Sequence, residues 1–213
     1  SANKDLIAEY GKDLFDAAKT YQRDFMFEAA VAGGIPIIRP LKECLAGNHL
    51  TEIIGIVNGT TNFILTKMRE NRMDFKEALE MAQKLGYAEA DPTSDVEGLD
   101  AGRKMAIMAS IAFHTRITFS DVYTEGITKI SAEDIRYAKE MGCEIKLLGV
   151  AKNNPDGVEV RVHPMLIPSS HALASVRDSF NAVFVHGDAV GDTMFYGRGA
   201  GEMPTGSAVA GDV

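Results

Sequence analysis

The stretch "SDVEGLDAGRKMAIMASIAF", residues 94–113, decides the fold that the sequence predicts. Its second half, "MAIMASIAF", is apolar almost all round, which is typical of a helix that runs into a hydrophobic core. Ser94 and Glu97 have the spacing of a capping box, so we expect the helix to begin at Ser94. It would then be the longest helix of the chain.

Asp100 and Lys104 lie four residues apart in this stretch and share one face of the expected helix. One interpretation is an exposed ion pair, worth about 0.3–0.5 kcal/mol. The other is a lysine tuned for proton transfer at the mouth of a buried helix, because burial lowers a lysine's pKa and a nearby carboxylate raises it again. The two residues alone leave both interpretations open.

Acidic residues precede this helix in the loop "GYAEADPTSD", residues 86–95. Asp91 before Pro92 is typical of a turn, and Asp95 in a first helical turn favours the helix dipole. These structural roles account for Asp91 and Asp95. Glu89 lies between small residues outside the expected helix, so a structural role explains it less well.

Further elements follow from hydrophobic periodicity and from capping and turn signals. Helices are expected over residues 5–22, 35–47 (short), 60–71, 74–86, 131–142 and 204–213. Strands are expected over residues 25–34, 49–59, 144–152, 157–167, 181–188 and 193–199. This mixed order predicts an α+β fold in which helices cover a mixed, largely antiparallel sheet.

Composition restricts the classes of protein that fit. The 213 residues are 46% hydrophobic and suffice for a buried core. A net charge of −8 argues against a nucleic-acid partner. No apolar run approaches the roughly 20 residues that span a bilayer, so we expect no membrane segment. The two cysteines form neither a disulfide framework nor a metal-spaced cluster, which favours a reducing cytoplasm.

Three glycine-containing segments have two interpretations each. "VNGTTNFIL" (57–65) places backbone N–H groups where they can receive an anion, or it is a capped turn. "YGRGAGEMPTGSAV" (196–209) indicates a close approach to the backbone, but it is not a complete dinucleotide fingerprint. "EAAVAGGIP" (28–36) is a close-packed turn, or it encloses a hard cation between one carboxylate and three backbone carbonyls. The residues of that cation site would be Glu28, Val31, Gly33 and Ile35.

Six segments in order resemble the homoserine dehydrogenase family across nearly the whole chain. They are "ANK" (2–4), "EAAVAGGIPII" (28–38), "GIVNGTTNFIL" (55–65), "LGYAEADPTSDVEGLDAGRK" (85–104), "KLLGVA" (146–151) and "GRGAGEMPTGSAVAGDV" (197–213). The third and fourth segments are long and specific. The resemblance implies an NAD(P)-dependent oxidoreductase that interconverts L-homoserine and L-aspartate 4-semialdehyde in threonine, methionine and isoleucine biosynthesis.

The resemblance also implies roles for individual residues. Lys104 matches the family's proton-donating lysine, and Asp100 matches the acid that binds substrate and orients that lysine. Glu89 matches the carboxylate that holds the substrate's amino group. Other implied substrate ligands are Tyr87, Asp95 and Lys4. The implied cofactor positions, for NADP or NAD, are Lys4, Gly86, Gly199, Ala200 and Gly201. The implied sodium ligands are Glu28, Val31, Gly33 and Ile35.

The family's nucleotide-binding domain should precede residue 1, so the resemblance implies that the chain is part of a larger enzyme. Residues 1–213 would be one catalytic and dimerisation domain of a homodimer, with remnants of a Rossmann-type domain at both ends. Residues 1–26 and 199–213 would border that domain, 37–166 would bind substrate, and 27–36 with 167–198 would dimerise. Alone, the chain is expected to be inactive.

The alternative is a non-catalytic binding or assembly module that kept the fold. Such a module needs none of the chemistry of Lys4, Glu89, Asp100 and Lys104, and the presence of all four favours the enzyme.

Overall fold

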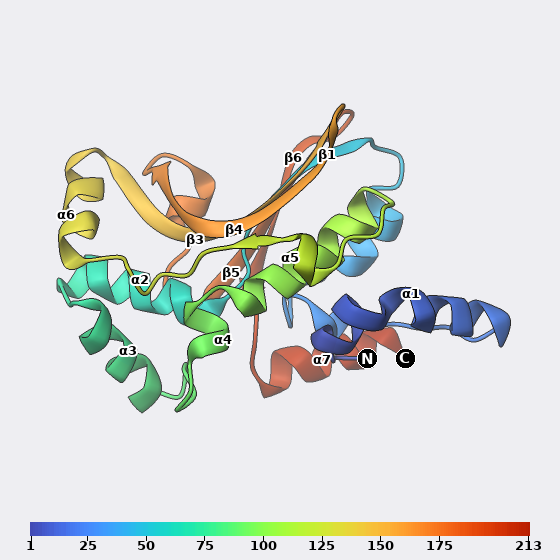
Figure 1. Ribbon diagram of the computed structural model, residues 1–213, viewed down its shortest axis with the longest axis horizontal. Coiled ribbons are helices and arrows are strands. Elements are labelled where there is room, and N and C mark those ends of the chain that lie inside the picture. Colours follow the sequence, from blue (N-terminus) through green and yellow to red (C-terminus); the bar gives the residue numbers. More distant parts are fainter.

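The computed structural model describes residues 1–213, which form one six-stranded sheet with α-helices along one side of it (Figure 1). The strands are β1 (Leu50–Ile56), β2 (Tyr123–Thr124), β3 (Cys143–Asn154), β4 (Gly157–Pro168), β5 (Phe180–Gly187) and β6 (Gly191–Arg198). Their spatial order is β2-β4-β3-β1-β5-β6, and every neighbouring pair is antiparallel except β2–β4. The expected mixed, largely antiparallel sheet is therefore confirmed.

Seven α-helices accompany the sheet: α1 (Lys4–Thr20), α2 (Gly59–Asn71), α3 (Phe75–Lys84), α4 (Thr93–Val96), α5 (Leu99–Ala112), α6 (Ala132–Glu140) and α7 (Glu202–Asp212). Short turns of 3₁₀ or π type are η1 (Glu28–Ala30), η2 (Pro40–Cys44), η3 (Phe119–Asp121) and η4 (Ala172–Ser175). Capping boxes at Asp74 and Ser131 start α3 and α6. None of these helices combines the length and the apolar character that crossing a bilayer requires.

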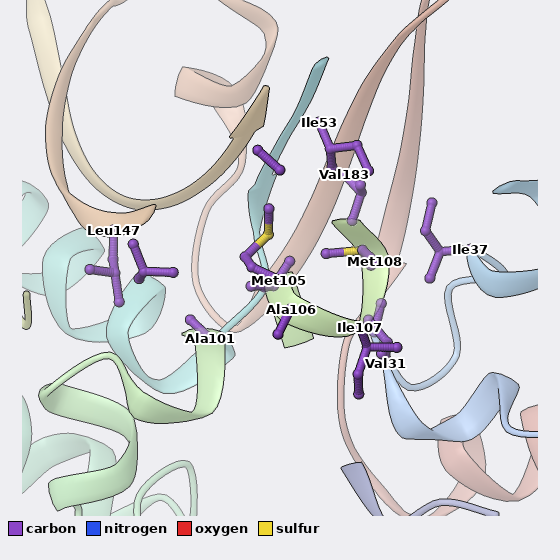
Figure 2. Packing of buried hydrophobic residues seen from close by; sticks show 14 of the residues in the cluster. Val31, Ile37, Ile53, Ala101, Met105, Ala106, Ile107, Met108, Leu147 and Val183 are labelled. Atoms are coloured by element: carbon purple, nitrogen blue, oxygen red, sulfur yellow. The ribbon is translucent and has the colours of Figure 1, made fainter. Parts of the chain in front are cut away.

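The core lies between one face of the sheet and α5 (Figure 2). Met105 and Met108 of α5 are fully buried, and Ile53 of β1 belongs to the same cluster. Because side chains alternate along a strand, Ile56 of β1 belongs to a smaller cluster that includes residues of η4. Burying one such side chain contributes about 1.5–3 kcal/mol. The apolar run of residues 105–113 therefore fixes α5 against the sheet.

The expected continuous helix from Ser94 is wrong, because the chain breaks at Gly98. α4 ends at Val96, α5 begins at Leu99, and Gly98 between them has a φ of +80°. No side chain caps the start of α4, so the expected capping box does not form. α5 itself has 14 residues, and α1 spans 17 residues across a kink at Tyr10. In an unbroken helix, the side chains of residues 95 and 100 would point in directions roughly 140° apart around the helix axis.

The strand expected over residues 25–34 is also wrong. The segment contains the turn η1, and no strand of the sheet pairs with it. A strand needs a neighbour for its backbone N–H and C=O groups, and this segment reaches the sheet through one backbone bond, from the N–H of Gly34 to the carbonyl oxygen of Arg198 at 3.0 Å. Phe27 and Val31 are nevertheless buried, which explains the apolar pattern that suggested a strand.

Replacing Gly98 by alanine is expected to destabilise the fold by about 1–2 kcal/mol, because alanine is strained in the left-handed conformation. The measurement is the free energy of unfolding in urea. Gly47→Ala is the matched control, since Gly47 is exposed and no atom lies within 4 Å of where its β carbon would be. Equal stability of the two variants would contradict a strained break at residue 98.

Candidate active site

A cleft with a volume of about 390 Å³ opens where α2 begins, beside the α4–α5 break and the turn after β6. Its lining residues are Asn58, Gly59, Thr60, Gly86, Tyr87, Asp95, Asp100, Lys104, Ser179, Arg198, Gly199, Ala200 and Gly201. The structure therefore brings together most of the residues that the sequence singled out. Asn58, Gly59, Thr60 and Arg198 lie in segments that the sequence analysis quoted without assigning them individual roles, and nothing in the sequence indicated Ser179.

Lys104 lies in this cleft and is largely buried. Its Nζ donates to Oδ2 of Asp100 at 2.7 Å and to the carbonyl oxygen of Val57 at 2.8 Å. The side chains of Lys104 and Asp100 are only 12% and 10% exposed, so the interpretation as a surface ion pair is wrong. An ammonium group has three N–H donors, and these two bonds leave one for a ligand in the cleft.

Asp100 is surrounded by donors and cations. Asn58 Nδ2 lies 2.9 Å from Oδ2 of Asp100, and Nζ of Lys4 lies 3.3 Å from its Oδ1. Burial pushes the pKa of Asp100 upward, but Lys104, Asn58 and Lys4 outweigh burial and hold it below its usual value. Asp100 is therefore a carboxylate at neutral pH.

Asn58 joins the start of α2 to both acidic residues of the cleft. Its Oδ1 accepts from the backbone N–H of Thr61 at 2.8 Å, which confirms the interpretation of this junction as a capped turn. Its Nδ2 donates to Asp95 at 2.6 Å and to Asp100 at 2.9 Å. The sequence indicated the cap, but nothing local indicated these contacts with residues 37 and 42 positions away.

Asp95 is less deeply buried than Asp100 and, unlike Asp100, has no ion pair with Lys4 or Lys104. Burial raises its pKa, and the negative charge of Asp100 raises it further, while the bond from Asn58 opposes the shift. Two carboxylates with different proton affinities therefore share one donor. This arrangement attracts a cationic group to the Asp95 side of the cleft.

Tyr87 and Gly86 line the cleft, but Glu89 does not. The carbonyl oxygen of Tyr87 accepts from Oγ1 of Thr60 at 2.6 Å, and its ring packs on Phe63 with 4.7 Å between centroids. Glu89 is exposed, and its backbone carbonyl accepts from the side chain of Gln83. The structure therefore does not bring its carboxylate into the cleft with Lys104.

The turn of residues 199–201 presents backbone to the cleft. A β carbon at Gly199 would lie 1.9 Å from Nδ2 of Asn181, so only glycine fits there. Asn181 is 1% exposed, and its Oδ1 has no hydrogen-bond partner. A flat group can approach this turn closely because two of its three residues, Gly199 and Gly201, have no side chain.

Glu28, the proposed sodium ligand, lies outside the cleft and is buried. Its carboxylate accepts from the backbone N–H groups of residues 37, 38 and 39 at 2.6–2.8 Å. These bonds leave Oε2 with a single donor. No group of three or more His, Cys, Asp or Glu side chains is placed to hold a metal ion. The sodium site stays a prediction.

The chain is similar in sequence to known proteins. The sequence profile described as homoserine dehydrogenase matches residues 36–213. The homoserine dehydrogenase of Bacillus subtilis is 53% identical over 213 residues, which are all of this chain and 49% of that protein. That of Corynebacterium glutamicum is 55% identical over 218 residues, with the same coverage of 100% and 49%.

Solved structures give the same result. A homoserine dehydrogenase from Thiobacillus denitrificans superposes with a TM-score of 0.97 at 53% identity, over 99% of this chain and 49% of that one. A hyperthermophilic archaeal homoserine dehydrogenase in complex with NADPH has a TM-score of 0.86 at 30% identity, over 99% and 61%. The chain spans about half the length of the curated relatives that it matches. It belongs to the homoserine dehydrogenase family.

Proposed function

We propose that this chain supplies the substrate-binding and proton-transfer part of an enzyme that interconverts L-homoserine and L-aspartate 4-semialdehyde. The observation that carries the proposal is the buried amine of Lys104, which faces the cleft with one N–H unused by the protein. The alternative, a non-catalytic assembly module, gives no reason to bury this lysine beside two carboxylates.

Lys104 acts on the oxygen of the reacting carbon. In the reducing direction it protonates the oxygen that becomes the hydroxyl of homoserine, and in the oxidising direction it takes that proton back. Asp100 fixes the direction of the amine through the 2.7 Å bond, and Lys4 stabilises Asp100 from its other oxygen. A positioned acid or base contributes roughly 10²–10⁴-fold to the rate.

Asp95 is the carboxylate of the cleft best placed for the substrate's ammonium group. Its pKa is raised by burial, so a cation beside it gains more than it would beside an exposed carboxylate. Glu89, exposed in this structure, and Tyr87 at the cleft remain candidate substrate ligands from the family resemblance.

Gly86 and the turn of residues 199–201 are the proposed nicotinamide contacts. They fit a flat ring, because Gly86, Gly199 and Gly201 present only backbone to the cleft and Nδ2 of Asn181 lies where a β carbon of residue 199 would be. When bound, NADP or NAD supplies the hydride chemistry. The relative solved with NADPH supports this cofactor class. A sodium ion at residues 28, 31, 33 and 35 belongs to the proposal, supported by the buried carboxylate of Glu28.

Residues 1–26 and 199–213 are inferred to border a nucleotide-binding domain. Large apolar side chains support this, since Tyr10 of α1 is 56% exposed and Met203 of α7 is 82% exposed. A homodimer through residues 27–36 and 167–198 is supported by the exposed Met194 and Tyr196 of β6. A cytoplasmic location, consistent with two unpaired cysteines, completes the proposal.

Lys104→Arg in the complete natural chain is expected to lower kcat for homoserine oxidation by about 10²–10⁴-fold. Arginine keeps a positive charge beside Asp100 but does not release its proton at neutral pH. Lys84→Ala, which removes an exposed lysine of α3, is the control and should retain full activity. A Lys104→Arg enzyme as active as the control would refute the assigned proton carrier.

Asp95→Asn is expected to raise KM for homoserine about tenfold, the effect of losing one charge-assisted contact. The raised pKa of Asp95 adds a pH effect. Only the carboxylate form attracts the ammonium, so KM of the wild type should rise as pH falls, beginning at a higher pH than for an ordinary aspartate. The variant should lack this rise. Parallel pH profiles of KM in both proteins would exclude Asp95 as the ligand.

The 213-residue chain alone is expected to show no homoserine oxidation with NADP or NAD, while the complete natural chain turns over. The physical reason is that hydride transfer needs a cofactor held by the inferred nucleotide-binding domain. The assay follows reduced cofactor at 340 nm. Turnover by the 213-residue chain would contradict the inferred domain arrangement.

A further inference from the structure

The segment of residues 176–180 joins η4 to β5 and forms part of the cleft wall through Ser179. A β carbon at Gly59 would lie only 2.8 Å from the carbonyl oxygen of Ser179, so the segment packs directly on the first residue of α2. Asp178 within it has a φ of +51°, a conformation that a non-glycine residue adopts only when its surroundings hold it.

Asn62, one turn into α2, binds three carbonyl groups of this segment. Its Nδ2 lies 3.3 Å, 2.9 Å and 3.1 Å from the carbonyl oxygens of Val176, Asp178 and Phe180. The side chain is buried, with 2% exposure. The helix whose first residues line the cleft therefore also holds the neighbouring wall.

Lys146 of β3 determines which way the carboxamide of Asn62 points. Its Nζ donates to Oδ1 of Asn62 at 2.9 Å and to the carbonyl oxygen of Val176. Because a lysine amine next to an amide must face the oxygen, the NH₂ of Asn62 is turned toward the carbonyls of the segment. Lys146 is 1% exposed and has no direct ion pair. Burying an amine costs free energy, which its hydrogen bonds must offset.

The bonds of Lys146 persist whether or not it carries a charge. Burial and, to a smaller extent, the nearby Arg177 lower its pKa to about 8, while Glu144 opposes the shift. A neutral amine still has two N–H groups, which are enough for both of its bonds. Arg177 is itself held by Glu144 through bonds of 2.7 Å and 3.0 Å, so the segment is tied to β3 at a second point.

We propose that Asn62 and Lys146 are positioning residues, which hold Ser179 against the start of α2 and so set the shape of the cleft for its substrate. This role deepens the proposed function and rests on it. These hydrogen bonds connect α2 and β3 to the segment that carries Ser179. Neither Asn62 nor Lys146 lines the cleft itself.

The test compares Asn62→Asp and Lys146→Met in the complete natural chain. Aspartate keeps the acceptor for Lys146 but replaces the NH₂ group by an oxygen that repels the three carbonyls. We expect KM for homoserine to rise about tenfold, the equivalent of one lost buried hydrogen bond, while kcat changes less than about threefold and KM for the cofactor is unchanged. Amide hydrogen exchange at residues 178 and 180 should accelerate in both variants.

Lys152→Met is the matched control. It is the same substitution on the same strand, but Lys152 is 41% exposed and pairs with Glu52 away from the segment. Folded variants whose KM and exchange equal those of this control overturn the inference. So does a failure of both variants to fold while the control folds, because the network would then be a requirement of the fold. If exchange accelerates in both variants as expected but the wild type itself never oxidises homoserine, the proposed function is refuted instead.

Discussion

The carboxamide of Asn58 is the interaction on which the cleft depends. Its oxygen starts α2, and its nitrogen holds two carboxylates that come from either side of the α4–α5 break. Without that donor, Asp95 and Asp100 would face each other as buried like charges, which costs free energy and protonates one of them. The position of Lys104 follows, because its amine is aimed by Asp100.

Helix α2 organises both sides of the site. Its first residues line the cleft, and Asn62 one turn later holds the segment that carries Ser179. The cap and the carboxamide of Asn62 are thus two polar contacts made by one helix with distant parts of the chain. The apolar packing of α5 against the sheet fixes the remaining wall, as the labelled methionines of Figure 2 illustrate. The polar contacts therefore specify the geometry of the cleft, and the apolar contacts stabilise the fold.

Much of this arrangement could be predicted from the sequence where a local pattern has one physical meaning. The helix expected over residues 131–142 is α6, which Ser131 caps, and the spacing of Asp100 and Lys104 placed both on one helix face. The prediction at Ser94 was wrong because the local capping pattern ignored Gly98, whose left-handed backbone breaks the helix. Contacts such as Lys4 with Asp100 join distant segments, and no periodicity encodes them.

The place of β1 in the sheet has a consequence for how the protein is made. β1 is the first strand of this sheet to be synthesised, yet it lies in the interior of the sheet between β3 and β5. At roughly 5–20 residues per second, both of its edges stay unpaired on the ribosome for several seconds. Glu52 is the only charged residue of β1. Its negative charge on the unpaired strand discourages pairing with strands of other nascent chains. In the finished sheet the same carboxylate pairs with Lys152 of β3.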